Sequence, residues 1–168
     1  DLQPLDIKLA TPDKAQAIFL AALPLAIKDD HPDYPALVLG NYMLGGGAIH
    51  SRIANRLRQQ EGLSYGASSQ FSASTLDPVA QWSAMAIYAP QNLTRLEAAF
   101  NEELAVALKE GFKREEMEAA KTSWLQNQAT SRSQDRELAN RLTQNLFSSR
   151  NMAWYADLET KLKALTEE

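Results

Sequence analysis

The segment Leu44–Tyr65, with the sequence LGGGAIHSRIANRLRQQEGLSY, decides how the rest of the chain is organised. It opens with three consecutive glycines, which predict a break in a helix because glycine loses more backbone entropy on folding than any other residue. Residues 49–57 then carry isoleucine or leucine at every fourth position, and this spacing predicts an amphipathic helix. Gly62 stands where a left-handed residue would end that helix. A strand is predicted to begin at residue 63.

Two polar side chains flank the turn between this predicted helix and strand. Arg58 lies near the end of the helix, and Tyr65 follows seven residues later, near the start of the strand. Because one tight turn joins the two elements, their polar tips are placed to converge on one point. Guanidinium and phenol groups are both hydrogen-bond donors, and arginine also stays charged and presents a rigid donor fork.

The same motifs resemble the pitrilysin/insulinase family of zinc metallopeptidases, which includes the mitochondrial processing peptidases. In that family one domain carries the inverted zinc motif H-x-x-E-H. A similar domain lacks metal and contributes an Arg and a Tyr, seven residues apart, that reach the substrate. The resemblance covers most of the chain and implies that this chain is the metal-free domain. It is carried by Leu44–Gly47, Ser51–Arg52, Leu57–Arg58 and Glu61–Tyr65.

The resemblance also implies where substrate would bind. The glycine run would form a flexible loop that lines a peptide cavity, and the histidine after it would donate to a substrate carbonyl. The arginine and tyrosine would act on a substrate held between the two domains. No catalytic residue and no metal ligand is expected within this chain alone. The expected substrate-binding residues are Gly45, Gly46, Gly47, His50, Arg58 and Tyr65.

Each of these positions also allows an interpretation without a ligand. The glycines fit a plain helix-breaking loop, and a phosphate loop is disfavoured because they follow a helix and no lysine follows them. His50 fits a surface position near a helix N-terminus. Arg58 fits a solvated helix surface. Tyr65 shares its parity with Leu63 and Phe71, so it also fits a core tyrosine with a paired hydroxyl.

Composition narrows the function classes. At 168 residues the chain is expected to be a single non-catalytic domain, 1–168, excised from a longer two-domain chain because it begins at Asp1 rather than Met. The net charge of −4 argues against a nucleic-acid partner. The chain has no cysteine and two histidines, His31 and His50, neither in a zinc motif. No apolar run approaches the roughly 20 residues that span a membrane.

The order of predicted elements indicates an α+β fold with a mostly antiparallel sheet covered by helices. The first strand is expected to end before Pro24 and, because both of its parities are apolar, to be buried on both faces. In strand 63–73, the side that carries Leu63, Tyr65 and Phe71 is expected to be buried. The resemblance implies the same architecture, a pitrilysin-like or LuxS-like metallopeptidase fold. Strands are predicted at 14–23, 63–73 and 79–89, with 1–9 as a possible fourth, and helices at 35–44, 50–60 and throughout 90–168.

These observations lead us to expect the non-zinc half of a zinc metalloendopeptidase, which helps enclose and orient peptide substrates and is inactive alone. Its expected partners are a homologous H-x-x-E-H domain or subunit, which would hold the zinc, and a peptide substrate. Weak self-association is expected when that partner is absent. Two alternatives stay open: a structural scaffold like the core subunits of a respiratory complex, and a non-catalytic peptide-binding module. An H-x-x-E-H motif in the partner would favour the enzyme.

Overall fold

The computed structural model of the chain describes residues 13–47 and 51–167. An antiparallel sheet of three strands in the order β1-β3-β2 runs through it, so β3 pairs with both of its neighbours. This sheet and the helices around it confirm the predicted α+β class. The possible fourth strand within residues 1–9 lies outside the described residues. The strands are β1 (Ala17–Leu25), β2 (Ser64–Ala73) and β3 (Ala80–Tyr88).

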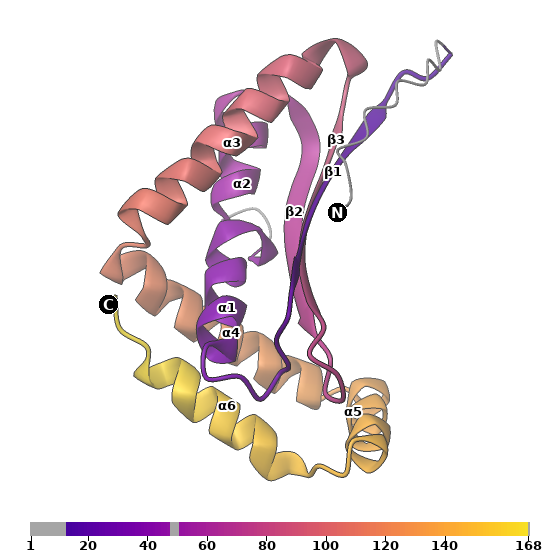
Figure 1. Cartoon of the computed structure of the whole chain (residues 1–168), viewed down its shortest axis with the longest axis vertical. Helices are drawn as coiled ribbons and strands as arrows, with labels where there is room; N and C mark the ends of the chain where they lie inside the picture. Colours follow the sequence, from indigo (N-terminus) through magenta and orange to yellow (C-terminus); the bar gives the residue numbers. More distant parts are fainter. Residues whose placement is uncertain (1–12, 48–50, 168) are drawn as a thin grey trace.

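The helices gather on one face of the sheet (Figure 1). In this view α1, α2 and α3 lie beside the sheet, while α4 and α6 run beneath α1 and α5 lies at the foot of the molecule. The layer between sheet and helices therefore holds the main core. The helices are α1 (Tyr34–Asn41), α2 (Arg52–Ala54), α3 (Leu93–Glu110), α4 (Arg114–Arg132), α5 (Asp135–Phe147) and α6 (Met152–Ala164), with a short 3₁₀ turn, η4 (Pro90–Asn92), before α3.

Two clusters of buried side chains hold these layers together. The larger lies between the sheet and α3, where the rings of Phe19 and Phe100 meet edge to face with their centroids 4.9 Å apart. The smaller joins α1, α4 and α6 through Leu39, Met117 and Leu162. Alternate residues of β3 face the larger cluster, so the period-two pattern seen in the sequence is the signal that orients the sheet.

The opposite face of the sheet is exposed. Ile18 and Leu20 of β1 are 60% and 73% exposed, and Met85 of β3 is 41% exposed. The expectation that β1 is buried on both faces is therefore wrong. The strand also continues through Pro24 to Leu25. In the sheet that the described residues form, β1 is an edge strand, where a residue without a backbone N–H is tolerated.

The helix break predicted at the glycines occurs, but two residues later than expected, because a π-helical turn carries the first helix to Gly46, within the glycine run. α1 continues into η1 (Tyr42–Gly46), and α2 continues into η3 (Asn55–Gln60). Gly45 within η1 packs so closely on β2 that a Cβ there would lie 2.3 Å from the Ser69 hydroxyl oxygen. That hydroxyl donates to the Asn41 side-chain oxygen at 2.7 Å. This glycine thus permits close contact between helix and strand rather than ending the helix.

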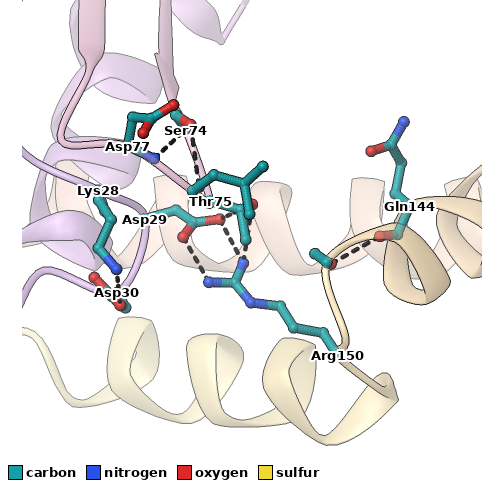
Figure 2. Close-up of polar contacts among 10 residues, drawn as sticks. Lys28, Asp29, Asp30, Ser74, Thr75, Asp77, Gln144 and Arg150 are labelled. Carbon is teal, nitrogen blue, oxygen red and sulfur yellow. Dashed lines mark hydrogen bonds and ion pairs between the residues drawn. The ribbon is translucent and has the colours of Figure 1, made fainter.

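A buried ion pair joins three loops at the foot of the molecule (Figure 2). Two guanidinium nitrogens of Arg150 lie 2.5 and 2.6 Å from the carboxylate oxygens of Asp29, whose side chain is 7% exposed. The Thr75 hydroxyl donates to the same carboxylate at 2.9 Å. The hydrogen bonds that Arg150 donates to Asp29 raise the pKa of Arg150, while burial and then the charge of Asp29 raise the pKa of Tyr34. The pair fastens the α5–α6 link to the β1–α1 loop, and Thr75 joins the β2–β3 turn to both partners.

Candidate functional site

The short helix that carries Arg58 has one buried side and two polar sides. Ile53 and Leu57 point into the core and are 1% and 0% exposed. Arg52 binds Glu116 on α4 with two nitrogens, at 2.9 and 2.7 Å, and this hydrogen bonding raises the pKa of Arg52. Arg58 is exposed and forms no hydrogen bond or ion pair with residues 13–47 or 51–167. Arg52 therefore holds two helices together, whereas Arg58 is left available to a ligand.

A single turn links this helix to β2. Gly62 has φ 62°, which confirms the left-handed residue predicted at the helix end. The Leu63 N–H donates to the Leu57 carbonyl at 2.9 Å and closes the turn. Arg58 directly follows the acceptor residue, and Tyr65 lies two residues beyond the donor. The hydrogen bond thus fixes the two elements that carry them against each other, while convergence of the two side chains on one point stays a prediction.

A β-bulge turns Tyr65 out of the sheet. Ser64 pairs with Tyr88 and Gly66 pairs with Ile87, so Tyr65 is the extra residue between two successive pairs. The Ser64 hydroxyl holds this shape, because it lies 2.7 Å from the Gly66 carbonyl and 2.8 Å from the Ile87 carbonyl. Tyr65 is consequently 79% exposed. The core interpretation of Tyr65, and its assignment to the buried parity of the strand, are wrong.

The glycine run lies apart from Tyr65. Gly45 is buried, Gly46 is exposed and Gly47 is half-buried. Gly47 borders a different hollow, of about 340 Å³, between η1 and α4. His50, the other expected substrate contact, lies outside the described residues. Substrate binding by these four residues stays a prediction, and among the described parts of the chain the glycines do not line the hollow next to Tyr65.

Tyr65 borders its own surface hollow, of about 420 Å³, at the end of the sheet. We call it the Tyr65 hollow. Its volume falls within the range of roughly 300–1,000 Å³ that ligand pockets occupy. No local pattern in the sequence points to its distant members, since residues remote in the chain meet there only after the sheet has formed. It is lined by Ala15, Gln16, Gly62, Leu63, Ser64, Tyr65, Ile87, Tyr88, Ala89 and Asn92.

In the described ranges, 13–47 and 51–167, no group of three or more His, Asp or Glu side chains is arranged to hold a metal ion. Over those same residues, no helix is both long and apolar enough to cross a bilayer.

Comparison with known proteins identifies the fold. An inactive M16 peptidase domain from Pseudomonas fluorescens is 24% identical with a TM-score of 0.76, and the match covers 92% of this chain and 36% of that one. A Helicobacter pylori protease is 16% identical with a TM-score of 0.77, over 93% and 37%. An inactive peptidase domain from Bordetella parapertussis is 18% identical with a TM-score of 0.72, over 94% and 84%.

The chain thus spans about a third of the first two proteins and most of the third. A search of curated protein sequences found no match. The family model of the peptidase M16 inactive domain matches residues 2–123, well over half of the chain. The match confirms the resemblance to the pitrilysin-type peptidases, and the name of the family agrees with the expectation that the domain is inactive on its own. The chain belongs to the peptidase M16 inactive domain family.

Proposed function

We propose that this domain is the substrate-binding, non-zinc half of a zinc metalloendopeptidase. The observation that carries the proposal is the pair of Arg58 and Tyr65, which are exposed, lie on elements joined by one hydrogen-bonded turn, and make no hydrogen bond or ion pair with the described residues. The proposed partner is a homologous H-x-x-E-H domain, on the same longer chain or on a second subunit. Gly45, Gly46, Gly47 and His50 remain part of the proposed substrate-binding set.

The chemistry proposed for Arg58 and Tyr65 is charge stabilisation. When water attacks a peptide bond, the carbonyl oxygen becomes negatively charged, and donors already aimed at it lower the barrier. The Arg58 guanidinium and the Tyr65 hydroxyl would supply those donors and would hold the peptide in register. Zinc bound by the other half would supply activation of the attacking water.

The exposed face of the sheet supports the proposal that the domain binds a partner. Ile18, Leu20 and Met85 are large apolar side chains on one uncovered surface, and contiguous apolar surface often marks an interaction site. In the proposed arrangement this face looks toward the space shared with the zinc-bearing half. Without that half the same surface would favour weak self-association.

Reconstitution tests the proposal. The zinc-bearing half alone should cleave peptides poorly, and adding this domain should produce a complex in sedimentation and raise kcat/KM. A complex with an H-x-x-E-H partner that gains no peptidase activity would contradict the proposal.

The exposed sheet face favours a second candidate, a structural scaffold. A scaffold would bind its partner through this face, and Arg58 and Tyr65 would have no role in it. Replacing these two residues would then leave complex formation unchanged, and the complex would show no peptidase activity with or without them. If peptide binds to a complex that lacks any zinc motif, the domain is instead a non-catalytic peptide-binding module.

A further inference from the structure

Strand pairing places Ser64, rather than Tyr65, on the core side of the sheet. From Gly66 to Ala73, β2 pairs with β3 in regular register, and one more step of that register would set Tyr65 opposite Tyr88. Residues directly opposite each other in a sheet share a face, and Tyr88 is buried in the larger core cluster. The bulge gives this position to Ser64, which is 6% exposed. Without the bulge, Tyr65 would therefore turn inward.

The Ser64 hydroxyl spans the bulge from the core side. A buried hydroxyl destabilises a fold unless it is hydrogen-bonded, and this one lies 2.7 Å from the Gly66 carbonyl and 2.8 Å from the Ile87 carbonyl. The first contact bridges the backbone on both sides of Tyr65, and the second crosses to the central strand. The single hydroxyl hydrogen can be directed at either carbonyl. An alanine in the same position would offer neither bond.

Tyr65 itself has no contact that would fix its direction. Its side chain makes no hydrogen bond, ion pair or ring contact with residues 13–47 or 51–167. The direction in which its hydroxyl points is thus set by the backbone that carries it, and this backbone is the bulge that Ser64 bridges.

We infer that Ser64 is a positioning residue, which holds Tyr65 in the orientation that meets the substrate carbonyl. The inference rests on the proposed function of Tyr65 and extends it to a buried residue that touches no substrate. Loss of the Ser64 hydroxyl would free the bulge to change shape, and Tyr65 would spend time away from the carbonyl. A displacement of about 1 Å at a reacting group can lower a rate by roughly 10²-fold.

The test uses the complete peptidase that contains this domain. Ser64→Ala removes the hydroxyl without adding volume and should lower kcat and kcat/KM alike, by roughly 10²-fold. Ser64→Thr keeps a hydroxyl and should restore most of the activity. Ser64→Cys supplies a weaker donor and should give an intermediate kcat, which keeps the test decisive if Ser64→Ala does not fold.

Thr75→Val is the control for stability. It removes the 2.9 Å hydrogen bond between Thr75 and Asp29, which lies beyond the opposite end of β2. Folded Thr75→Val enzyme should have the kcat of the wild type, because this bond is remote from Tyr65.

Two further measurements separate positioning from a general loss of structure. In the Tyr65→Phe enzyme, adding Ser64→Ala should cause no further loss of kcat, because Ser64 acts through the Tyr65 hydroxyl. In fluorine NMR spectra of enzyme labelled with fluorotyrosine, the signal that Tyr65→Phe removes should broaden in Ser64→Ala and stay sharp in Thr75→Val.

The outcomes distinguish this inference from the proposed function. If Tyr65→Phe lowers kcat but Ser64→Ala lowers it no more than Thr75→Val does, the positioning role is overturned and the proposed function stands. A further loss when Ser64→Ala is added to the Tyr65→Phe enzyme, or an unchanged fluorine signal in Ser64→Ala, also overturns the positioning role. If Tyr65→Phe leaves hydrolysis unchanged, the proposed role of Tyr65 is overturned and this inference with it.

Discussion

Three arginines of one short helix meet different surroundings. Arg52 is bound by Glu116, and Arg56 lies 2.8 Å from a carboxylate oxygen of Glu102. Arg58 has no such partner within the described residues. Substitution of Arg52 should therefore disturb the contact between two helices, whereas substitution of Arg58 should affect only what binds there.

Arg58→Ala and Tyr65→Phe should leave folding almost unchanged, because both side chains are exposed. If they stabilise the same carbonyl oxygen, each should lower kcat/KM of the complete peptidase by roughly 10²–10³-fold, the typical loss for one such donor. Their combined effect should be less than additive, since residues that act as a unit are not independent. Thermal melts and peptidase assays on the same preparations measure both properties.

Arg95→Ala is the matched control for these two variants. Arg95 is an exposed arginine of α3 whose contact with Glu61 is 3.3 Å long. Its loss should change neither the melting temperature nor kcat/KM noticeably. Normal peptidase activity in Arg58→Ala would remove Arg58 from the proposed site.

Two helical glycines allow a direct comparison of close packing. A Cβ at Gly45 would lie 2.3 Å from the Ser69 hydroxyl oxygen and 2.5 Å from its backbone nitrogen, whereas a Cβ at Gly40 would meet nothing nearer than 3.9 Å. Gly45→Ala should thus destabilise the domain by about 1–3 kcal/mol. Gly40→Ala should stabilise it by about 0.5–1 kcal/mol, because alanine is the better helix former. Urea unfolding of both variants measures the difference, and equal stabilities would contradict the close-packing role of Gly45.

At the scale of elements, the strand alternation and the helix spacing predicted most of the architecture. The residues of β3 alternate as expected, and the turn at Gly62 is left-handed as expected. Predictions from sequence spacing were less accurate where two chain segments pack against each other. Gly45 extends a helix because β2 lies against it, and Tyr65 points outward because an extra residue enters the pairing. A glycine inside a strand, here Gly66, is a signal for such a bulge.

The ion pair of Asp29 and Arg150 should contribute strongly to the free energy of unfolding, because it holds the loops at the foot of the sheet together. Arg150→Ala would leave the Asp29 carboxylate buried without its countercharge, which typically costs about 3–5 kcal/mol. Lys161→Ala breaks an exposed pair with Asp157, whose side chains are 61% and 58% exposed, and should cost about 0.5 kcal/mol or less. Urea unfolding compares them, and a loss for Arg150→Ala as small as that for Lys161→Ala would contradict the central role of the pair.

The whole molecule is a sheet with helices on one side and an open apolar face on the other (Figure 1). The sequence could predict that the domain lacks the usual zinc ligands, since it has no cysteine and two histidines. It could not predict which side of β1 is open, because the residues on both sides of that strand are apolar. The open face and the Tyr65 hollow depend on strand order, which no local pattern in the chain specifies.

Purified domain should hold no stoichiometric zinc, because it has no cysteine, its two histidines stand in no zinc motif, and no group of three or more His, Asp or Glu among the described residues is placed to hold a metal ion. Elemental analysis after extensive dialysis measures the metal content. The complete peptidase should retain zinc under the same dialysis and serves as the positive control. About one tightly held zinc ion per isolated domain would contradict the assignment of this chain as the metal-free half.

The bond between Asp29 and Arg150 joins residues 121 positions apart, and this separation has a kinetic consequence. Ordering so long a loop costs entropy that is recovered only when most of the fold is in place. We expect the pair to form after the folding transition state, so its loss should act on unfolding. Arg150→Ala should leave the refolding rate nearly unchanged and should accelerate unfolding by on the order of 10²–10³-fold, which stopped-flow chevron measurements would record. The two chain regions that this pair joins would then set how long the native domain persists, rather than how fast it is reached.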